Sequence, residues 1–518
     1  MQNGSDIRGV AVDGVEGEPV SLTPAMVFFI GQAFVDWLSA KAGSPASDLR
    51  VSVGSDPRVS RSALVSAFAS GLCSCGVSVC DVGLATTPAM FMSTVLPELA
   101  FDGAVMLTAS HLPYNRNGLK FFTRDGGLDK ADIKAILDAA TERATESLAA
   151  HGLSQELDMD AAMLRGTLEA SSDLLQRAAG CALHSYSEHL KGLIREGVRH
   201  PEHPDTPLAG LRIVVDAGNG SGGFFATLLE ELGADVSGSQ FLVPDGTFPN
   251  HVPNPEDAAA MESAAGAVLA AGADLGLVFD TDVDRSAVVA ADGREVNRNR
   301  LIAALSAIVL EENPGSTIVT DSVTSKGLAE FIAARGGVHL RYKRGYKNVI
   351  SKGVEVNAQG GECHLMIETS GHGAMRENYF LDDGAYLAVK ILIKLVRLRL
   401  EGGDGVDGVQ QLLEGYADPL EGEEVRFKIT DIDRMKEVGG RVLEAFKGWG
   451  AEQGWALEEE NHEGWRFNVG ESGWVLLRQS LHDPILVLNA ESDAAGQVAE
   501  VVGQVRAFVQ SCGEPVEA

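Results

Sequence analysis

The chain has 518 residues, of which 45% are hydrophobic and 22% are charged, an ordinary balance for a globular protein. A single domain with one hydrophobic core is rarely this long, so the length predicts about three to four domains. The formal net charge of −31 argues against nucleic acid or an anionic membrane as a partner. It leaves room for a phosphorylated small molecule, which a local group of Arg and Lys can bind.

The cysteines indicate an intracellular protein. Six are present, at positions 73, 75, 80, 181, 363 and 512, and they show no metal-ligand pattern. Reduced thiols in the cytoplasm or a plastid stroma are expected rather than the disulfides of a secreted protein. No apolar run reaches membrane-spanning length, so no membrane partner is expected. Motif-like sequence begins at Asp6 without a signal peptide, and an earlier, removed targeting segment stays open.

The first part of the chain alternates strands and helices. After Asp6-Ile7-Arg8-Gly9, Thr23 and Pro24 mark the start of a helix. Strands are predicted at 49–53, 77–82 and 103–107, with a helix at 60–72 between the first two. The last of these strands runs into the loop 108–113, and Ala-rich helical sequence follows over much of 131–194. This alternation predicts βαβ units and a mainly parallel sheet.

The same rhythm returns after a Pro- and His-rich linker at 200–207. A strand at 212–215 leads into a Gly-rich turn at 216–223, and a buried strand at 275–279 follows. A further block begins near Arg298, with strands at 317–320 and 339–342, a polar turn at 368–372 and a long helix at 384–400. The last part differs, because strands at 425–429, 465–468, 474–477 and 485–488 accompany two helices in an α+β pattern.

We therefore predict an α/β fold with four domains around a central cleft. Three similar α/β domains with mixed or parallel sheets are expected at 1–181, 182–297 and 298–420, followed by a smaller α+β domain at 421–518. Ligands of open α/β sheets bind beyond the carboxyl ends of the strands, where the polar loops of this chain lie.

The segment after the strand 275–279 is the strongest candidate for a metal site. Asp280, Asp282 and Asp284 follow the strand directly, and three carboxylates so close repel one another unless a cation lies between them. Mg²⁺ prefers such oxygen ligands and keeps positions open for water or phosphate. Arg285 comes next, and its planar guanidinium suits a phosphate group.

Three other interpretations apply to this acidic segment: an EF-hand loop, the loop of a phosphatase and an exposed turn. An EF-hand loop is excluded, because Arg285 and Ala291 stand where that loop needs Gly and Glu. A phosphatase of the haloacid-dehalogenase type, with Asp280 as nucleophile, remains the alternative. A solvent-exposed acidic turn is the simplest structural interpretation.

Ser110 is a candidate nucleophile at the end of the strand 103–107. A serine hydroxyl needs a base or a metal to react, and His111 is adjacent, while Lys120 is a candidate acid or base if its surroundings lower its pKa. The Gly-x-Ser-x-Gly pattern of an α/β-hydrolase is missing. An ordinary turn remains the alternative at Ser110.

Later loops offer groups that suit a sugar phosphate. Glu368, Ser370 and His372 supply donors and acceptors for hydroxyl groups, although they could instead form a helix N-cap turn. Residues 344–347 are basic, which more often means surface charge. Residues 478–484 could wrap a phosphate with Arg478 and Ser480 or form a β-turn. The turn 216–223 lacks the Lys-Ser/Thr of a Walker loop and is expected to pack close to the metal loop.

The order of these motifs resembles the α-D-phosphohexomutases, which include phosphoglucomutases, phosphomannomutases and phosphoglucosamine mutases. The resemblance runs from Asp6 to about Glu491. The motifs that carry it are Asp-Ile-Arg-Gly at 6–9, Thr-Ala-Ser-His-x-Pro at 108–113, Asn-Gly-Leu-Lys at 117–120, Asp-x-Asp-x-Asp-Arg at 280–285, Glu-x-Ser-Gly-His at 368–372 and Arg-x-Ser at 478–480.

The resemblance implies a role for each matching residue. Ser110 would carry the phosphate and would bind Mg²⁺ together with Asp280, Asp282 and Asp284. The residues implied around the transferring group are Arg8, His111, Lys120 and Arg285. Those implied in substrate binding are Gly345, Lys347, Glu368, Ser370, His372, Arg478, Ser480 and His482. The expected partners are a phosphorylated hexose and a sugar bisphosphate activator, and the expected oligomeric state is monomer or dimer.

The function that the resemblance implies is interconversion of a hexose 1-phosphate and 6-phosphate through a phosphoserine and a bisphosphorylated sugar, with glucose or mannose preferred. Phosphoglucosamine mutase, an Asp-nucleophile phosphatase and a catalytically silent sugar-phosphate-binding homologue are the alternatives. Three positions depart from the family pattern in the last loop, where Leu481, His482 and Asp483 replace Gly, Thr and Glu. Thr281 and Ile367 also replace glycines that are common in the family.

Overall fold

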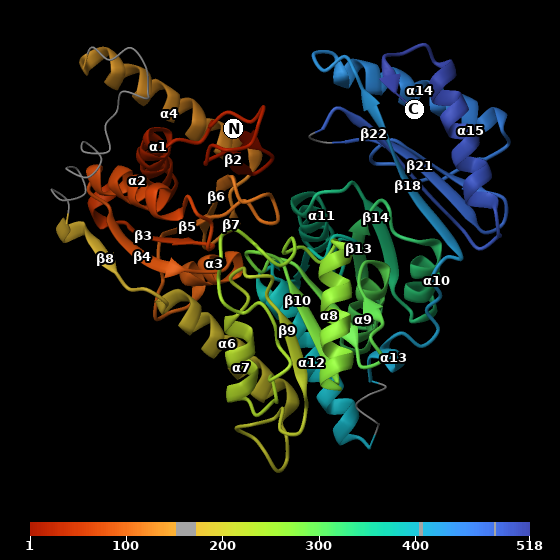
Figure 1. The fold of residues 1–518 in the computed structure, drawn as a ribbon, viewed down its shortest axis with the longest axis horizontal. Helices are drawn as coiled ribbons and strands as arrows, with labels where there is room; N and C mark the ends of the chain where they lie inside the picture. Colours follow the sequence, from red (N-terminus) through yellow and green to blue (C-terminus); the bar gives the residue numbers. More distant parts are fainter. Residues whose placement is uncertain (152–171, 403–407, 481–482, 518) are drawn as a thin grey trace. The chain divides into compact units, whose positions relative to one another are not determined.

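The computed structural model describes residues 1–151, 172–402, 408–480 and 483–517. These residues form two compact units (Figure 1). The first unit comprises residues 1–297, 370–374 and 378–409, and the second comprises residues 298–369, 375–377 and 410–518. Each unit is described by itself.

The N-terminal sheet of the first unit is mixed. Its strand order is β1-β2-β6-β5-β3-β4-β8, with β7 beside β6. The central strands β3, β4 and β5 and the edge strand β8 run parallel, whereas β6 is antiparallel to both β5 and β2. The bounds are Gln2–Asn3 (β1), Asp6–Val10 (β2), Arg50–Ser55 (β3), Ser78–Leu84 (β4), Gly103–Leu107 (β5), Arg116–Thr123 (β6), Gly126–Gly127 (β7) and Leu175–Arg177 (β8).

Four helices accompany this sheet: α1 (Pro24–Ala42), α2 (Arg61–Ser74), α3 (Thr87–Val95) and α4 (Lys130–His151). The start of α1 is set by local sequence, because the Thr23 side chain accepts a hydrogen bond from the backbone N–H of Met26 and Pro24 occupies the first turn. Helices α1, α2 and α4 bury their apolar residues against β3, β5 and β6 in one continuous core.

The second sheet of this unit has the order β12-β11-β10-β9. Strands β9 (Ile213–Asp216) and β10 (Leu275–Phe279) are parallel, and β11 (Ser286–Ala290) and β12 (Glu295–Val296) continue the sheet antiparallel. Helix α8 (Ala258–Ala271) packs on β9, β10 and β11, and α12 (Gly384–Leu400) contacts β10, β11 and α6 (Cys181–Val198). Helix α7 (Phe224–Glu231) follows the Gly-rich turn.

In the second unit, β13 (Thr317–Asp321) pairs in parallel with β14 (Val338–Tyr342) and β15 (Cys363–Ile367). Three helices surround these strands: α9 (Asn299–Glu312), α10 (Lys326–Ala334) and α11 (Tyr346–Ala358). The short strands β16 (Gly373–Met375) and β17 (Leu381–Asp382) and the helix α13 (Gly408–Leu412) follow in the chain; β17 and parts of β16 and α13 belong to the first unit.

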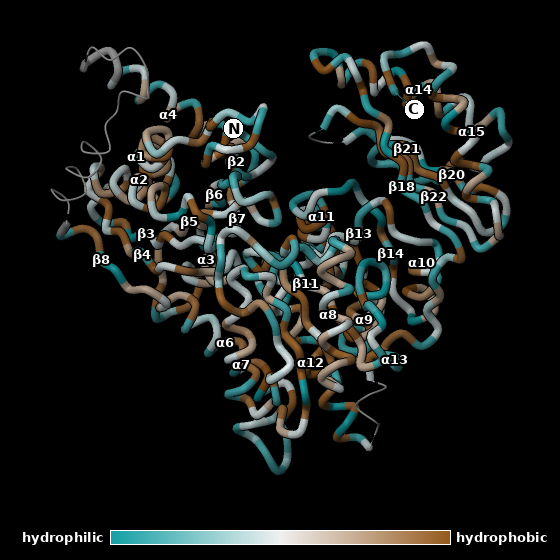
Figure 2. The backbone as a smooth tube through the Cα atoms, in the orientation of Figure 1, coloured by the Kyte–Doolittle hydropathy of each residue, from teal (hydrophilic) through white to brown (hydrophobic). Residues whose placement is uncertain are grey.

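The C-terminal sheet of the second unit is antiparallel, with the order β19-β20-β21-β22-β18-β23. Helices α14 (Met435–Glu452) and α15 (Gln497–Ser511) pack on its hydrophobic strands (Figure 2). The strand bounds are Glu421–Ile429 (β18), Ala456–Leu457 (β19), Trp465–Val469 (β20), Gly473–Gln479 (β21), Ile485–Ser492 (β22) and Val516–Glu517 (β23).

The predicted fold class is confirmed: three α/β sheets precede a β-rich α+β region. The expectation of a mainly parallel first sheet is wrong in part, because β1, β2, β6 and β7 pair antiparallel. Residues 117–120, for which no strand was predicted, lie on β6. The boundaries predicted at 181, 297 and 420 remain predictions. Among the described residues, no helix is long and apolar enough to cross a membrane.

Candidate active site

Ser110 is buried in a strained turn that other residues hold in place. Its φ of 52° is a left-handed conformation that non-glycine residues rarely adopt without support. The guanidinium of buried Arg58 donates hydrogen bonds to the backbone carbonyl of Ser110 and, at 2.7 and 2.6 Å, to those of Leu112 and Pro113. Asp56 in turn pairs with Arg58 Nε at 3.0 Å. The turn is therefore fixed by a buried ion pair.

The Ser110 hydroxyl lies among charged side chains from a distant part of the sequence. Its Oγ donates to Asp280 Oδ2 at 3.0 Å and accepts from Arg285 Nη2 at 2.7 Å. Arg285 Nη2 also donates to His111 Nδ1. Burial and the neighbouring Arg285 charge lower the pKa of His111 to about 2, so its imidazole is neutral and accepts this hydrogen bond.

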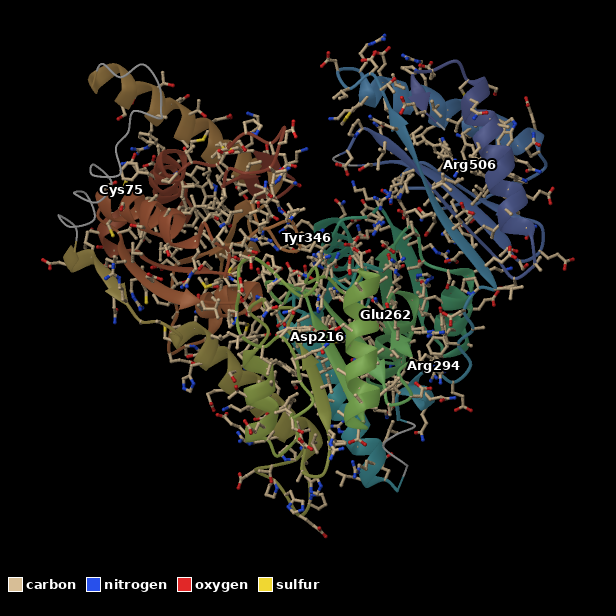
Figure 3. The ribbon with its side chains drawn as sticks, viewed as in Figure 1. Cys75, Asp216, Glu262, Arg294, Tyr346 and Arg506 are labelled. Carbon is tan, nitrogen blue, oxygen red and sulfur yellow. The ribbon has the colours of Figure 1, made fainter. Side chains whose placement is uncertain are left out.

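The metal loop 280–284 connects β10 and β11 within a closely packed backbone. Val283 has a φ of 67°, and the N–H of Ser221 donates to the carbonyl of Thr281 at 2.8 Å. A Cβ on Gly220 would lie 2.7 Å from that same carbonyl oxygen, so glycine permits the close approach. The predicted packing of the turn 216–223 against the metal loop is confirmed. At the end of β9, Asp216 (labelled in Figure 3) fixes the turn by accepting from the N–H of Gly218 at 2.9 Å.

The three carboxylates of the metal loop form a site that suits a divalent cation. Asp280, Asp282 and Asp284 are all buried, and their ligand oxygens lie within 4.8 Å of one another. Oδ1 of Asp282 and Oδ1 of Asp284 have no hydrogen-bond partner. Burial and the charges of its two neighbours raise the pKa of Asp280 well above its ordinary value. A hard cation would relieve this repulsion and use the two free oxygens, so the residues fit Mg²⁺.

Lys120 and Thr87 contact the same carboxylates. The Lys120 Nζ, from β6, donates to Asp284 Oδ2 and lies 3.3 Å from Asp282 Oδ2. Thr87 Oγ1, from the first turn of α3, donates to Asp282 Oδ2 at 2.5 Å. The side chain of Lys120 is buried, so its ammonium group is held between acidic groups and away from bulk water.

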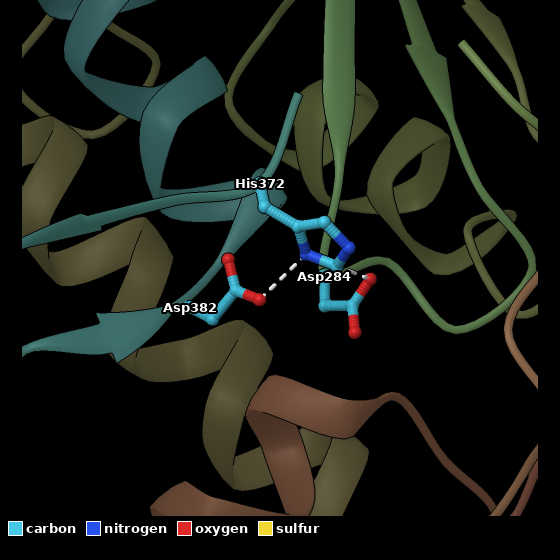
Figure 4. A group of neighbouring side chains, drawn as sticks. All are labelled: Asp284, His372 and Asp382. Atoms are coloured by element: carbon cyan, nitrogen blue, oxygen red, sulfur yellow. Dashed lines mark hydrogen bonds and ion pairs between the residues drawn. The ribbon is translucent and has the colours of Figure 1, made fainter. Parts of the chain in front are cut away.

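His372 lies beside the metal loop, next to Asp284 and Asp382 (Figure 4). Its Nδ1 lies 2.6 Å from Asp382 Oδ2 and 3.7 Å from Asp284 Oδ1. Although burial disfavours the imidazolium, the Asp382 and Asp284 carboxylates raise the pKa of His372 to about 9. Gly371, with a φ of 92°, brings this turn against the backbone of Ser286. The structure thus places His372 beside the metal loop rather than in an independent turn.

Arg8 lies on β2, which pairs with β6. Its guanidinium forms an ion pair with Asp6 at 2.9 Å, and its charge contributes to the lowered pKa of His111. Ser370 is buried in the first unit, and its Oγ has no hydrogen-bond partner. The first unit therefore brings together Ser110, His111, Lys120, the three aspartates, Arg285 and His372.

A second group of predicted residues lies in the second unit. Arg478, on β21, is buried, and its Nε has no hydrogen-bond partner. Burial and the charge of Arg344 lower the pKa of Arg478. A buried guanidinium with another cation nearby favours an anionic ligand. The turn at Gly464 packs directly on this strand, because a Cβ there would lie 2.0 Å from the carbonyl oxygen of Leu477.

Two consecutive backbone N–H groups link this strand to the predicted sugar-binding turn. The N–H of Gly345 donates to Glu368 Oε1 at 2.7 Å, and the N–H of Arg344 donates to Glu463 Oε1 at 2.9 Å. Gly345 has a φ of 107°, which explains the glycine before α11. The Glu463 side chain also accepts from Ser322 Oγ. Glu368 and the Arg478 strand are thus joined through residues 344–345.

The remaining predicted residues are Lys347, Ser480 and His482. Lys347 lies in the first turn of α11, beside Tyr346. The Ser480 N–H donates to the carbonyl of Ile485 at 3.0 Å, and the Asp483 N–H donates to Ser480 Oγ at 3.2 Å. His482 lies outside the described residues.

The sequence did not single out Thr87, Asp382, Glu463 or the supporting role of Arg58. Thr87, Glu463 and Arg58 act on partners far away in the chain, Thr87 and Asp282 being 195 positions apart, whereas Asp382 and His372 are 10 positions apart. The local signal for Arg58 was the segment Asp56-Pro57-Arg58. Its two charged residues follow a buried strand where the chain turns.

Comparison with known proteins identifies the family. The model described as "Phosphoglucomutase/phosphomannomutase, alpha/beta/alpha domain I" matches residues 2–147, and the corresponding models for domains II and III match residues 185–293 and 297–404. The chain is 30% identical over 500 residues to a phosphomannomutase/phosphoglucomutase of Pseudomonas syringae pv. tomato, covering 96% of this chain and 92% of that protein.

Other relatives have different names. A phosphoglucomutase of Neisseria gonorrhoeae is 28% identical, with 98% of this chain and 96% of the relative covered. A phosphoglucosamine mutase of Bifidobacterium animalis is also 28% identical, with 97% and 98% covered. The crystal structure of a phosphoglucomutase/phosphomannomutase family protein from Burkholderia thailandensis shares the fold, with a TM-score of 0.75 at 24% identity and coverage of 99% and 98%. On the family models and the Pseudomonas relative, the chain belongs to the α-D-phosphohexomutase family, whose members are mutases of the isomerase class.

Proposed function

We propose that this chain is a hexose phosphomutase that interconverts a sugar 1-phosphate and 6-phosphate, with glucose or mannose phosphate as substrate, through a phosphoserine at position 110. The observation that carries the proposal is the setting of Ser110 Oγ, which lies 3.0 Å from Asp280 and 2.7 Å from Arg285. A serine held between a carboxylate cluster and a guanidinium suits a group that gives and regains phosphate.

The transfer balances as follows. A sugar hydroxyl attacks the phosphorus of phospho-Ser110, the bond from phosphorus to Ser110 Oγ breaks, and a bond to the sugar oxygen forms. The hydroxyl proton passes to a base, for which Lys120 is the candidate: it acts as the neutral amine in this step and becomes the ammonium that donates to Asp284. The resulting sugar bisphosphate turns over. The bond from its other phosphorus to the sugar oxygen breaks as a bond to Ser110 Oγ forms, and the proton returns from the base to that sugar oxygen. Buried positive groups oppose the charge of the phosphoryl group throughout.

Asp280, Asp282 and Asp284, with the Ser110 oxygen, would hold Mg²⁺. The bound ion would supply positive charge that neutralises the transferring phosphoryl group. Arg285 and Lys120 would add donors from protein, and the rigid packing of the loop 280–284 would keep the carboxylates in place.

The substrate's other end calls for different residues. Glu368 offers a carboxylate for sugar hydroxyls, and buried Arg478 offers a guanidinium with an unused Nε for the phosphate that does not react. Ser370, His372, Gly345, Lys347, Ser480 and His482 complete the proposed substrate contacts, and Arg8 and His111 those around the transferring group.

The Asp-nucleophile phosphatase is disfavoured by the contacts of Asp280. Its Oδ1 accepts from the N–H of Arg285 at 3.2 Å, and its Oδ2 accepts from both Ser110 Oγ and Arg285 Nε. Oδ2, the Asp280 oxygen at Ser110, accepts two hydrogen bonds, which suits a carboxylate that orients the Ser110 hydroxyl better than one that attacks phosphorus. The phosphoglucosamine mutase relative keeps that substrate as the alternative sugar.

The test combines turnover with mapping of the phosphate. Wild type, Ser110→Ala and the surface control Ser74→Ala would be assayed for conversion of the 1-phosphates of glucose, mannose, glucosamine and N-acetylglucosamine, with Mg²⁺ and a sugar bisphosphate. Peptide mass spectrometry should find one phosphate on Ser110 in wild type and in Ser74→Ala, and Ser110→Ala should be inactive. Phosphate on Asp280 and release of inorganic phosphate would instead support the phosphatase.

A further inference from the structure

Thr87 makes two hydrogen bonds to a single residue of the metal loop. Its side-chain Oγ1 donates to Asp282 Oδ2 at 2.5 Å, and its backbone N–H donates to the carbonyl of Asp282 at 2.8 Å. Both residues are buried. The preceding residue, Thr86, caps α3 by accepting from the N–H of Ala89 at 3.2 Å, so the Thr87 side chain is not needed as the cap.

These contacts place the two oxygens of the Asp282 carboxylate in different environments. Oδ2 accepts from Thr87 and lies 3.3 Å from the Lys120 ammonium, whereas Oδ1 is buried and has no hydrogen-bond partner. Asp284 shows the same division, because its Oδ2 accepts from Lys120 and its Oδ1 has no hydrogen-bond partner. Each carboxylate therefore has one oxygen that accepts no hydrogen bond, and that of Asp284 lies 3.7 Å from His372 Nδ1.

The number of oxygens that a carboxylate offers affects which cation it favours. Mg²⁺ is small and demands a near-octahedral set of six ligands, one oxygen from each carboxylate being sufficient, whereas Ca²⁺ takes six to eight oxygens and often binds both oxygens of one carboxylate. We propose that Thr87 is a positioning residue for Mg²⁺ selectivity: by holding Oδ2, it restricts Asp282 to one-oxygen coordination and disfavours Ca²⁺. This inference rests on the metal site of the proposed function.

The substitution Thr87→Val removes the hydroxyl while keeping the shape and branching of the side chain. Oδ2 of Asp282 then loses its closest donor, and the carboxylate can rotate to offer both oxygens. We expect Mg²⁺ to bind more weakly and Ca²⁺ more tightly, so the ratio of the Ca²⁺ Kd to the Mg²⁺ Kd should fall about tenfold, the typical effect of one hydrogen bond to a charged group. Thr87→Ser keeps the hydroxyl and should keep the ratio near that of wild type.

Thr86→Val is the matched control for a purely structural role. It removes the α3 cap but no contact to Asp282, so it should lower the unfolding temperature and leave the Kd ratio unchanged. The Mg²⁺ and Ca²⁺ Kd values of all four full-length proteins would be measured by isothermal titration calorimetry without substrate.

A fall in the ratio in Thr87→Val alone supports the proposal. The same ratio in Thr87→Val and wild type, or an equal fall in Thr86→Val, overturns it while leaving the proposed function intact. Failure of wild type to bind Mg²⁺ at all would overturn the metal site itself and, with it, this inference.

Discussion

The phenol hydroxyl of Tyr186 donates a 2.6 Å hydrogen bond to Oδ1 of Asp383, joining α6 to the residue that caps α12. Both side chains are buried. The Asp383 carboxylate also accepts from the N–H of Tyr386 and from Asn378 Nδ2, each at 2.9 Å. This bond ties two helices of the first unit that are distant in the sequence, and it lets the ionisation of one carboxyl group affect stability.

Burial raises the pKa of Asp383 to about 6 from its ordinary 3.8. Because this pKa is higher in the folded than in the unfolded chain, the folded state binds more protons between these values. The contribution of Asp383 to stability is therefore largest below pH 3.8 and is lost as pH rises through about 6. Its hydrogen-bond donors become more valuable once it is ionised.

Tyr186→Phe should accordingly destabilise the protein more at pH 8 than at pH 5. We expect a loss of about 1.5–3 kcal/mol at pH 8, where the bond reaches a charged group, and about 0.5–1.5 kcal/mol at pH 5. Urea unfolding at both pH values measures this. In the control Tyr416→Phe, the lost hydrogen bonds are to the exposed Asp418 and to Ser325, and the effect should be equal at the two pH values. An equal loss at the two pH values in Tyr186→Phe would contradict the prediction.

Arg58→Lys should impair turnover through the Ser110 turn. Lysine cannot donate to several backbone carbonyls at once as the Arg58 guanidinium does, so Ser110 should lose its fixed position. We expect kcat to fall on the order of tenfold to a hundredfold with a smaller change in KM. Arg116, the half-exposed first residue of β6, provides the control Arg116→Lys, which should stay near wild type. Steady-state kinetics would refute the role if Arg58→Lys kept its kcat.

Gly220→Ala should disturb the metal loop. Its Cβ would lie 2.7 Å from the carbonyl oxygen and 2.8 Å from the Cα of Thr281, and backbone atoms cannot rotate away as a side chain can. A shift of this loop should weaken Mg²⁺ binding and lower kcat on the order of a hundredfold. Gly266→Ala is the control, because nothing lies within 4 Å of the new Cβ and an alanine within α8 should add about 1 kcal/mol of stability. Calorimetry would measure Mg²⁺ binding, and steady-state kinetics would measure kcat, for both variants. Equal values in Gly220→Ala and wild type would contradict the prediction.

Arg478→Ala should weaken the hold on the phosphate that does not react. Charge-assisted hydrogen bonds of about 1.5–3 kcal/mol predict a fall in kcat/KM of about tenfold to a hundredfold or more. Ser110 lies in the other unit, so its phosphate content should persist, as peptide mass spectrometry would show. Arg426→Ala, at a side chain that is 70% exposed on β18, should have little effect. An unchanged kcat/KM in Arg478→Ala would favour the silent homologue.

The sequence alone predicted those parts of the protein that depend on neighbouring residues. Strands β5 and β10 and helix α12 have the predicted bounds, because hydrophobic runs and the Gly-rich sequence that follows α12 are local signals. The three aspartates of the metal loop were found for the same reason, since alternate positions after one strand must lie close together.

Tertiary structure decided which distant residues meet. Ser110 and Asp280 are 170 positions apart, and Thr87 and Asp282 are 195 apart, so no local pattern relates them. The antiparallel placement of β6, which puts Lys120 at the metal loop, likewise follows from strand pairing across the sheet. Such contacts depend on which apolar faces pack together, and many pairings satisfy the same hydrophobic pattern. The acidic ligands could therefore be identified from the sequence. The residues that donate hydrogen bonds to them could be identified only from the packing of the sheets and helices.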